Sequence, residues 1–262
     1  MIDSHCHLDV PRFDRDRSEA LVRAWAQGVE GVVIPAIGPA AWDGLLVWPR
    51  SDPRIQVGLG IHPQLLPDLP EDQDGLHLER LDACLGQGIA CAVGECGLDG
   101  PTSARASFDR QLRVLDGHLR LAHKHRLPLL VHCHRAHPVF ETWLERVHLP
   151  DAGVVLHSYS GGAERVAAYA ARGCWFSFAG PVTWPEARRP PEALRVVPAD
   201  RLLAETDAPD QTPEPYRGTR SEPGFLVHIV EAMARHRGEE RAELARRLSE
   251  NARRFFSRPF FS

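Results

Sequence analysis

The chain has 262 residues and a formal net charge of −4, with 43% hydrophobic and 25% charged residues. This balance is that of a globular protein and excludes disordered, collagen-like and highly charged scaffold classes. No apolar run approaches the roughly 20 residues of a membrane span, and the first residues lack the basic and apolar regions of a signal peptide. We therefore expect a cytoplasmic protein whose six cysteines are free thiols.

Eight short apolar runs follow one another along the chain. Several are apolar without strict alternation, which is typical of parallel strands buried on both faces. The runs cover residues 1–5, 31–36, 55–61, 89–95, 128–132, 153–157, 174–178 and 202–206.

Amphipathic stretches separate these runs. The strongest covers 105–126, where one apolar stripe joins Phe108, Leu112, Leu115, Leu119 and Ala122. Further helices are expected over 13–28, 75–87, 137–147, 162–172, 185–195, 224–236 and 239–256. Because repeated β-then-α units require parallel strands with right-handed crossovers, the pattern predicts an α/β fold, either a closed eight-stranded barrel or an open doubly wound sheet. No long linker interrupts the series, so we expect one domain over residues 1–262.

Histidine and carboxylate side chains gather at the ends of the predicted strands. His5 and His7 stand two residues apart and so share one face of an extended strand. Taken singly, such residues are more often capped core histidines, strand-end charges or turn formers than ligands. In a parallel barrel, however, the carboxyl ends of all strands converge at one mouth, where active sites lie. The set comprises His5, His7, Glu95, His132, His157 and Asp207.

A mixed set of imidazoles and carboxylates suits Zn²⁺, Mn²⁺ or a similar divalent ion. Six ligands exceed the needs of one catalytic ion, whereas two ions about 3.5–4 Å apart would use them. The strand ends therefore predict a metal-dependent enzyme.

Short motifs in this order resemble the TatD-type metal-dependent deoxyribonuclease family, and the likeness runs from residue 2 to about residue 256. The motifs are DSHCHLD at 3–9, GIHP at 60–63, GECGLD at 94–99, VHCH at 131–134, LHSYSGG at 156–162, ETDAP at 205–209, PEPYRG at 213–218 and the closing NARRFF at 251–256. The resemblance implies a single (β/α)8 TIM-type barrel of the metal-dependent hydrolase group. It also implies that the family's ligand positions fall on the six strand-end residues.

Two divalent ions, Mg²⁺, Mn²⁺ or Zn²⁺, are the implied cofactors. We assign His5, His7, Glu95 and Asp207 to one ion, and Glu95, His132 and His157 to the other, with Glu95 bridging them. Asp207 is also expected to accept a proton from the attacking water. Glu205 shares the face of Asp207 by the strand period of two, so it orders that water or a ligand, or it has a structural role only.

Two departures from the family pattern leave the substrate preference open. His134-Arg135 replaces a common Arg-Asp pair, and Gly100-Pro101-Thr102 replaces a tyrosine-rich stretch. The lysine content bears on the branch of the superfamily, because phosphotriesterase- and dihydroorotase-like relatives commonly bridge their metals with a carboxylated lysine. The single lysine, Lys124, falls in a predicted helix, so Glu95 takes the bridging place. This favours the nuclease branch.

Substrate contacts are expected from His62, at the end of the third strand, and from Arg217, in the loop after the eighth. Simple packing is as plausible for His62, and Arg220 is a weaker phosphate candidate. Trp184 is the tryptophan placed to stack on a base. The net acidity excludes binding of nucleic acid through a broad basic face, but it allows a site that holds a few phosphates through metal ions.

The leading function is a metal-dependent deoxyribonuclease with DNA, and possible RNA, as substrate. It would remove nucleotides from DNA ends or single strands. The alternative is a metal-dependent deacylase that uses the same site on a small acyl substrate. A third class, a regulatory protein with a vestigial site, is disfavoured because all six ligand positions are intact.

Overall fold

A parallel eight-stranded sheet forms the centre of the computed structural model, which describes residues 1–100 and 106–256. The strands pair in sequence order, and every pairing is parallel. They are β1 (Ile2–Asp3), β2 (Gly31–Pro35), β3 (Ile55–Leu59), β4 (Ala92–Asp99), β5 (Leu129–His134), β6 (Val154–Leu156), β7 (Cys174–Phe178) and β8 (Leu202–Ala204). Each predicted apolar run overlaps one of these strands.

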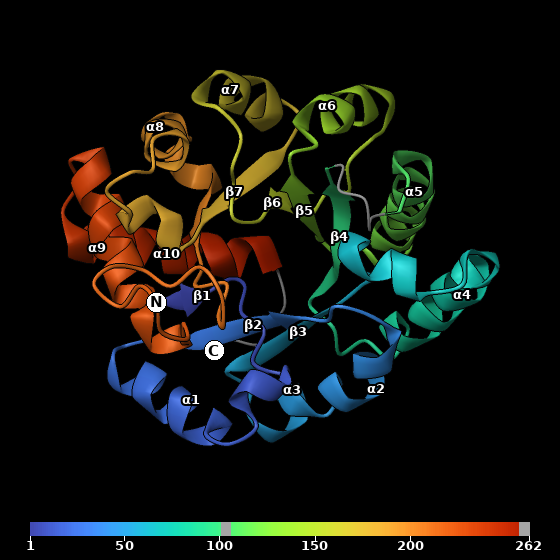
Figure 1. The fold of residues 1–262 in the computed structure, drawn as a ribbon, viewed down its shortest axis with the longest axis horizontal. Coiled ribbons are helices and arrows are strands. Elements are labelled where there is room, and N and C mark those ends of the chain that lie inside the picture. The colour runs from blue at the N-terminus through green and yellow to red at the C-terminus, as the bar shows by residue number, and fades with distance from the viewer. Residues whose placement is uncertain (101–105, 257–262) are drawn as a thin grey trace.

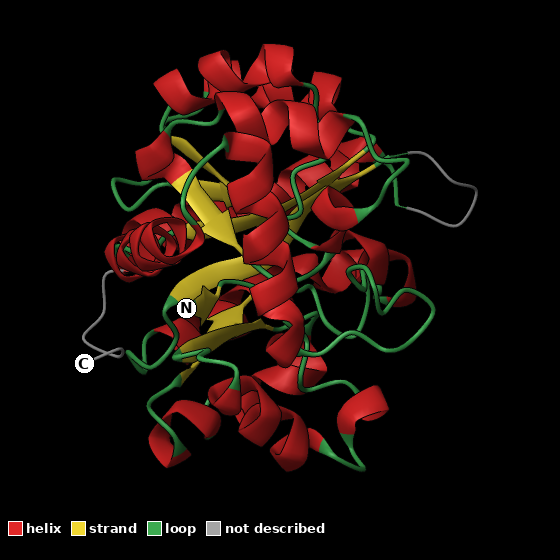
Figure 2. Cartoon of the chain, turned by 90° about the vertical axis from the view of Figure 1, so that its left-hand side faces the viewer, coloured by secondary structure: helices red, strands yellow, loops and turns green. Residues whose placement is uncertain are grey.

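Backbone hydrogen bonds join the segment after β1 to the end of β8 and to the segment that follows β8, and they close the sheet into a barrel. Ser4 N donates to Ala204 O at 3.1 Å, and Asp207 N donates to His5 O at 2.9 Å. The predicted TIM-type barrel is therefore confirmed, and the open doubly wound alternative is wrong. Figure 1 shows the helices arranged around the central strands, and Figure 2 shows the sheet enclosed by helices from the side.

The helices of the described residues follow the predicted series with a few differences. The first predicted helix begins later, because Pro11–Phe13 forms a separate 3-10 turn before it. Two helices of four residues, α2 and α3, were not predicted, since so short a segment cannot show a helical period. The helices are α1 (Arg17–Ala26), α2 (Trp42–Leu45), α3 (Trp48–Ser51), α4 (Asp74–Leu85), α5 (Phe108–His125), α6 (His137–Arg146), α7 (Ala163–Ala171), α8 (Arg189–Val196), α9 (Leu226–Arg237) and α10 (Arg241–Phe256). None of these helices is both long and apolar enough to span a membrane.

The helix with the strongest predicted stripe, α5, covers β4 and β5 on the outside of the barrel. The side chain of Ser107 caps its start by accepting the amide of Arg110 at 3.2 Å. Leu115 and Ala122 of the stripe are fully buried, whereas Phe108 at its beginning is only partly buried. Leu112 is also only partly buried. The helical period thus identified the element and part of its buried face, which also contains Arg110, Gln111, Val114, Gly117 and His118.

An apolar cluster fills the amino-terminal end of the barrel, and α10 closes that end. Phe255 of α10 packs against Trp175 of β7 with ring centroids 5.1 Å apart. The polar strand ends consequently face the opposite, open mouth. The cluster contains Ile2, Val33, Cys91, Ala92, Leu130, Val155, Trp175, Leu203, Ala252, Phe255 and Phe256.

Candidate metal centre

The six predicted ligands lie together at the mouth of the barrel. They come from or directly after β1, β4, β5, β6 and β8. A cavity of about 610 Å³ opens there, and every member of the set except the buried His5 lines it. The same cavity has an apolar wall formed by Ile37, Leu65, Phe178, Val182 and Trp184. The full set is His5, His7, Glu95, His132, His157 and Asp207.

Glu95 occupies an irregular part of β4. The pairing with β5 shifts register between Val93 and Cys96, so Glu95 lies within a bulge. Gly94 precedes it with φ 134°, and a Cβ there would meet Leu130 O at 2.5 Å. Glycine is therefore required at this position, because any side chain would collide with β5. A bulge of this kind redirects a side chain, and here it turns Glu95 into the barrel.

The two carboxylate oxygens of Glu95 face two different pairs of histidines. Oε2 lies 3.2 Å from His5 Nε2 and 3.4 Å from His7 Nε2. Oε1 lies 2.8 Å from His157 Nε2 and 3.2 Å from His132 Nδ1. The single carboxylate thus stands between the pairs.

Asp207 approaches the His5–His7 pair from the opposite side of the barrel. Its Oδ1 lies 3.8 Å from His5 Nε2 and 3.7 Å from His7 Nε2. The backbone of Asp207 has φ 51°, and its amide is held by His5 O. Gln211 donates its side-chain amide to Oδ2, which leaves Oδ1 directed at the histidines.

Oxygen atoms behind three of the histidines favour a proton on the nitrogen that points away from Glu95. His7 Nδ1 lies 3.2 Å from Pro35 O, and His132 Nε2 lies 3.3 Å from a carboxylate oxygen of Asp99. His157 Nδ1 lies 3.5 Å from Glu205 Oε1. A neutral imidazole protonated on its outer nitrogen presents a lone pair on the inner one, which is the arrangement of metal-ligating histidines.

The inner nitrogens of each pair lie close together, and in that tautomer neither His132 Nδ1 nor His157 Nε2 carries a hydrogen atom. His5 Nε2 and His7 Nε2 are 3.2 Å apart, and His132 Nδ1 and His157 Nε2 are 3.1 Å apart. Neither carboxylate oxygen of the buried Glu95 has a hydrogen-bond partner of good geometry. Ligand atoms about 2.1 Å from a tetrahedral ion are themselves about 3.4 Å apart, so these spacings fit divalent cations. Groups that could hold an ion include His5, His7 and Glu95 together.

The charges of the site are strongly coupled. Burial by itself raises the pKa of Glu95, but His62, His157 and His5 outweigh it and hold that pKa well below its ordinary value. Burial lowers the pKa of His157, whereas Glu95 and Glu205 act in the other direction and raise it well above its ordinary value. Glu95 is therefore an anion that needs positive charge beside it, which protons or cations supply.

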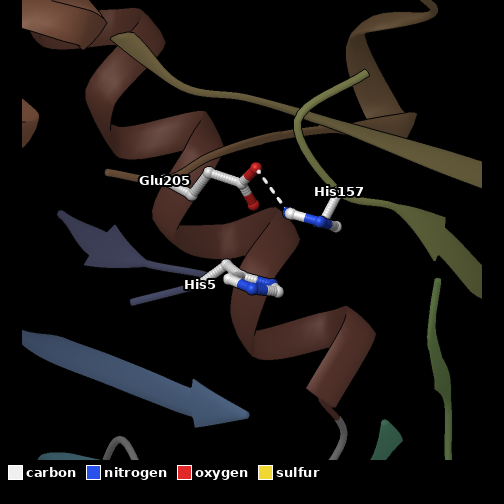
Figure 3. Close-up of side chains that lie close together, drawn as sticks. All are labelled: His5, His157 and Glu205. Carbon is white, nitrogen blue, oxygen red and sulfur yellow. Dashed lines mark ion pairs between the residues drawn. The ribbon is translucent and has the colours of Figure 1, made fainter. Parts of the chain in front are cut away.

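Glu205 lies behind His157 and not beside Asp207. Its Oε2 accepts the hydroxyl of Ser177 at 2.5 Å, and its Oε1 accepts the amide of Ser158 at 2.5 Å. Figure 3 shows the carboxylate directed at His157, with the ring of His5 below both residues. The ring centroids of His5 and His157 are 4.0 Å apart and stacked. Glu205 thus lies next to a candidate ligand, and the roles expected for it stay predictions.

Two buried carboxylates with a place in the site were not identified from the sequence. Asp99 stands behind His132, as described above, and accepts the side-chain amide of Gln64. Asp3 accepts two hydrogen bonds from Thr206, at 2.5 and 2.9 Å. Both lie at strand ends within the motifs quoted above. That position could have identified them from the sequence.

His62 reaches Glu95 from the third strand end. Its Nδ1 accepts the amide of Gln64 at 3.1 Å, so the proton of the neutral ring is on Nε2, which lies 3.2 Å from Glu95 Oε1. Burial lowers the pKa of His62 to about 4, so the ring is neutral at pH 7. His62 therefore presents a hydrogen-bond donor to the cavity.

Arg217 lies outside the cavity wall. Its guanidinium is 2.6 Å from Glu186 and stacks over the ring of Trp184 at 4.5 Å. Trp184 itself lines the cavity, and its indole donates to Thr212 O at 2.9 Å. The other loop arginine, Arg220, is paired with Asp16 at 2.6 Å. Trp184 is consequently the predicted substrate contact that faces the candidate site, and Arg217 stands behind it.

The two departures from the family pattern have different outcomes. His134 lines the cavity, whereas Pro101 and Thr102 lie outside the described residues. Lys124 of α5 pairs with Asp82 of α4 at 2.5 Å, outside the barrel. It does not reach the site, so the place between the histidine pairs belongs to Glu95.

Known proteins resemble this chain over nearly its whole length. A family described as TatD related DNase matches residues 2–257. The chain is 32% identical over 260 residues to an uncharacterized metal-dependent hydrolase, YjjV, of Escherichia coli K12, covering 98% of each chain. It is 34% identical over 272 residues to a protein of Escherichia fergusonii named 3'-5' ssDNA/RNA exonuclease TatD, covering 99% of this chain and 100% of that one.

Solved structures share the fold. The crystal structure of the YjjV protein, a TatD homolog from Escherichia coli K12, superimposes with a TM-score of 0.91 at 30% identity over 99% of this chain and 98% of that one. A hydrolase of the TatD family from Entamoeba histolytica superimposes with a TM-score of 0.82 at 18% identity over 97% and 96% of the two chains.

Proposed function

Since this chain belongs to the TatD family of metal-dependent hydrolases, we propose that it is a divalent-metal-dependent exonuclease that hydrolyses phosphodiester bonds at the ends of single-stranded DNA or RNA. The observation that carries the proposal is the position of Glu95, with one carboxylate oxygen toward each pair of histidines. Relatives named as single-strand exonucleases support the choice of substrate.

The proposed ligand set uses both oxygens of Glu95. One ion would be held by His5, His7, Asp207 and Glu95, and the other by His132, His157 and Glu95. Mg²⁺, Mn²⁺ and Zn²⁺ are all compatible with nitrogen and oxygen ligands of this kind. When bound, two such ions lower the pKa of a water molecule toward 7 and neutralise charge on the phosphate.

The side chains around the proposed ions supply the remaining steps. Asp207 is the proton acceptor, because its Oδ1 faces the centre and its Oδ2 is held by Gln211. His62 donates from Nε2 to a non-bridging phosphate oxygen, since its other nitrogen is already an acceptor. Glu205 and Asp99 keep His157 and His132 oriented and basic.

The cavity supports cleavage at a strand end. A volume of about 610 Å³ is in the range of small-molecule sites and suits one terminal nucleotide. Phe178, Val182 and Trp184 form an apolar wall against which a base can stack.

The test is hydrolysis of end-labelled single-stranded DNA and RNA by the metal-loaded protein, beside a panel of acyl substrates. We expect stepwise release of nucleotides and loss of that activity, together with bound metal, in Glu95→Gln. Glu79→Gln, on the exposed surface of α4, makes the same change of charge and should leave both nucleotide release and bound metal unchanged. If acyl substrates alone were cleaved, and that cleavage depended on Glu95, the deacylase alternative would replace this proposal.

A further inference from the structure

A second cavity adjoins the one at the candidate metal centre. Its volume is about 550 Å³, and it shares Val182 and Trp184 with the first cavity. It lies between the segment after β7, α8 and the end of α9. Arg188, Arg195, Arg235 and His236 contribute its basic side chains, and we call it the arginine pocket.

The positive charge of the arginine pocket is poorly compensated. Glu192 is the one acidic residue of its wall. Arg235 is already paired with Glu231 of the same helix at 3.0 Å. Within the described residues, the side chain of Arg188 makes neither an ion pair nor a hydrogen bond, and it is exposed.

Arg195 is oriented by a histidine instead of a carboxylate. His236 Nε2 lies 2.9 Å from Val182 O and donates to it, so Nδ1 of the neutral ring is an acceptor. Arg195 Nη2 lies 3.5 Å from that Nδ1. The guanidinium is thus held in place while its charge stays available to an anion.

We propose that the arginine pocket binds a backbone phosphate of the same strand whose end lies at the metal centre, through Arg188 and Arg195. This inference rests on the proposed exonuclease function. Guanidinium groups match phosphate oxygens in geometry and charge. Trp184 belongs to both cavities and offers its ring to a base between them, with Arg217 stacked on it. A strand crossing Trp184 therefore runs from one cavity into the other.

The test compares substrates of different length. In Arg188→Gln/Arg195→Gln, kcat/KM for long oligonucleotides should fall on the order of tenfold, because two charged hydrogen-bonding groups are lost. A dinucleotide has one internucleotide phosphate, which must lie at the metal centre to be cleaved, so the variant should hydrolyse it as the wild type does. Binding of a long oligonucleotide should also depend less on salt. The slope of the logarithm of its binding constant against the logarithm of the salt concentration should become shallower by about 0.7 for each phosphate contact removed.

Arg246→Gln and Arg253→Gln combined provide the matched control, because α10 lies at the closed end of the barrel and the charge change is the same. Equal losses for all lengths, or no loss at any length, would overturn the proposal. So would tight binding of inorganic phosphate that is lost in the variant without any effect of substrate length, since the pocket would then serve free phosphate. A wild type that releases nucleotides from no substrate would instead refute the proposed function.

Discussion

Asp3 of β1 and Thr206, just after β8, join the first and last strands of the barrel through a buried pair of hydrogen bonds, although they are 203 positions apart in the sequence. Thr206 Oγ1 donates to Asp3 Oδ2 at 2.5 Å, and Thr206 N donates to Asp3 Oδ1 at 2.9 Å. Asp3 also accepts the amide of His5 at 3.3 Å. The contact therefore sets the relative positions of His5 and Asp207, which face the same side of Glu95.

Thr206→Val removes the side-chain donor but keeps the shape of the residue. We expect a loss of about 1–3 kcal/mol in the free energy of unfolding, because Asp3 Oδ2 is left buried without a partner. Metal affinity should fall about 10–100-fold, as when an outer partner of a metal ligand is removed. Calorimetric metal titration and chemical denaturation measure the two effects. Thr219→Val, on an exposed loop, is the control; equal effects in both variants would contradict the role of Thr206.

Asp99→Asn and Glu205→Gln test the carboxylates behind His132 and His157. Both variants should weaken the ion of the His132–His157 pair and leave the ion of the His5–His7 pair bound, because Asp99 pairs with His132 and Glu205 pairs with His157. The Asp99 variant is the cleaner test, since Glu205 also lies within 4.8 Å of a ring nitrogen of His5. Activity should fall about 10–100-fold. Elemental analysis after dialysis should give one ion per chain in place of two. Loss of both ions in either variant would show that the two sites are not separable.

His118 makes stability depend on pH through a group outside the metal centre. Burial lowers its pKa from 6.5 to about 4, although its Nδ1 donates to Val114 O at 2.7 Å. A depressed pKa in the folded state stabilises the protein above pH 6.5, and this contribution is lost as the pH falls from 6.5 to about 4.

His118→Gln should remove that part of the pH dependence, worth on the order of 3 kcal/mol between neutral pH and pH 4. Denaturation curves of both proteins across this range measure the difference. His148→Gln changes an exposed histidine and should keep the wild-type profile. If the free energy of unfolding fell by the same amount on acidification in His118→Gln and in the wild type, His118 would not be the group responsible.

Trp184 should contribute more to binding of single strands than Arg217. Trp184→Leu removes a stacking surface from the cavity wall and should weaken binding by about 1–3 kcal/mol. Arg217→Ala should cost less than about 1 kcal/mol, because that half-exposed guanidinium is already paired with Glu186. Fluorescence anisotropy with a hydrolysis-resistant oligonucleotide compares them, with Trp48→Leu on α3 as control. A larger loss of binding in Arg217→Ala than in Trp184→Leu would show that Arg217 is the main contact of the strand.

The sequence alone was sufficient for the repeating units and for the position of each candidate ligand along them. Apolar runs marked every strand, because strands buried on both faces need little more than a short apolar segment. Helical periodicity marked α5, whereas the four-residue α2 and α3 were too short to leave such a pattern. His5, Glu95 and Asp207 were singled out because polar residues at the ends of apolar strands are unusual and because parallel strands bring their ends together.

The tertiary structure decided what each of these side chains faces. The bulge in β4 directs the two oxygens of Glu95 to different histidine pairs, and this depends on the close approach of β5 to Gly94. Glu205 was expected beside Asp207, but it lies behind His157, because the positive φ of Asp207 ends the alternation of the strand. Arg217 was expected at the mouth, but it lies outside the cavity wall, where it pairs with Glu186 and stacks on Trp184. The partners of Glu95, Glu205 and Arg217 are far from them in the sequence. Several residues compete for each contact, and they come close to one another only when the barrel closes.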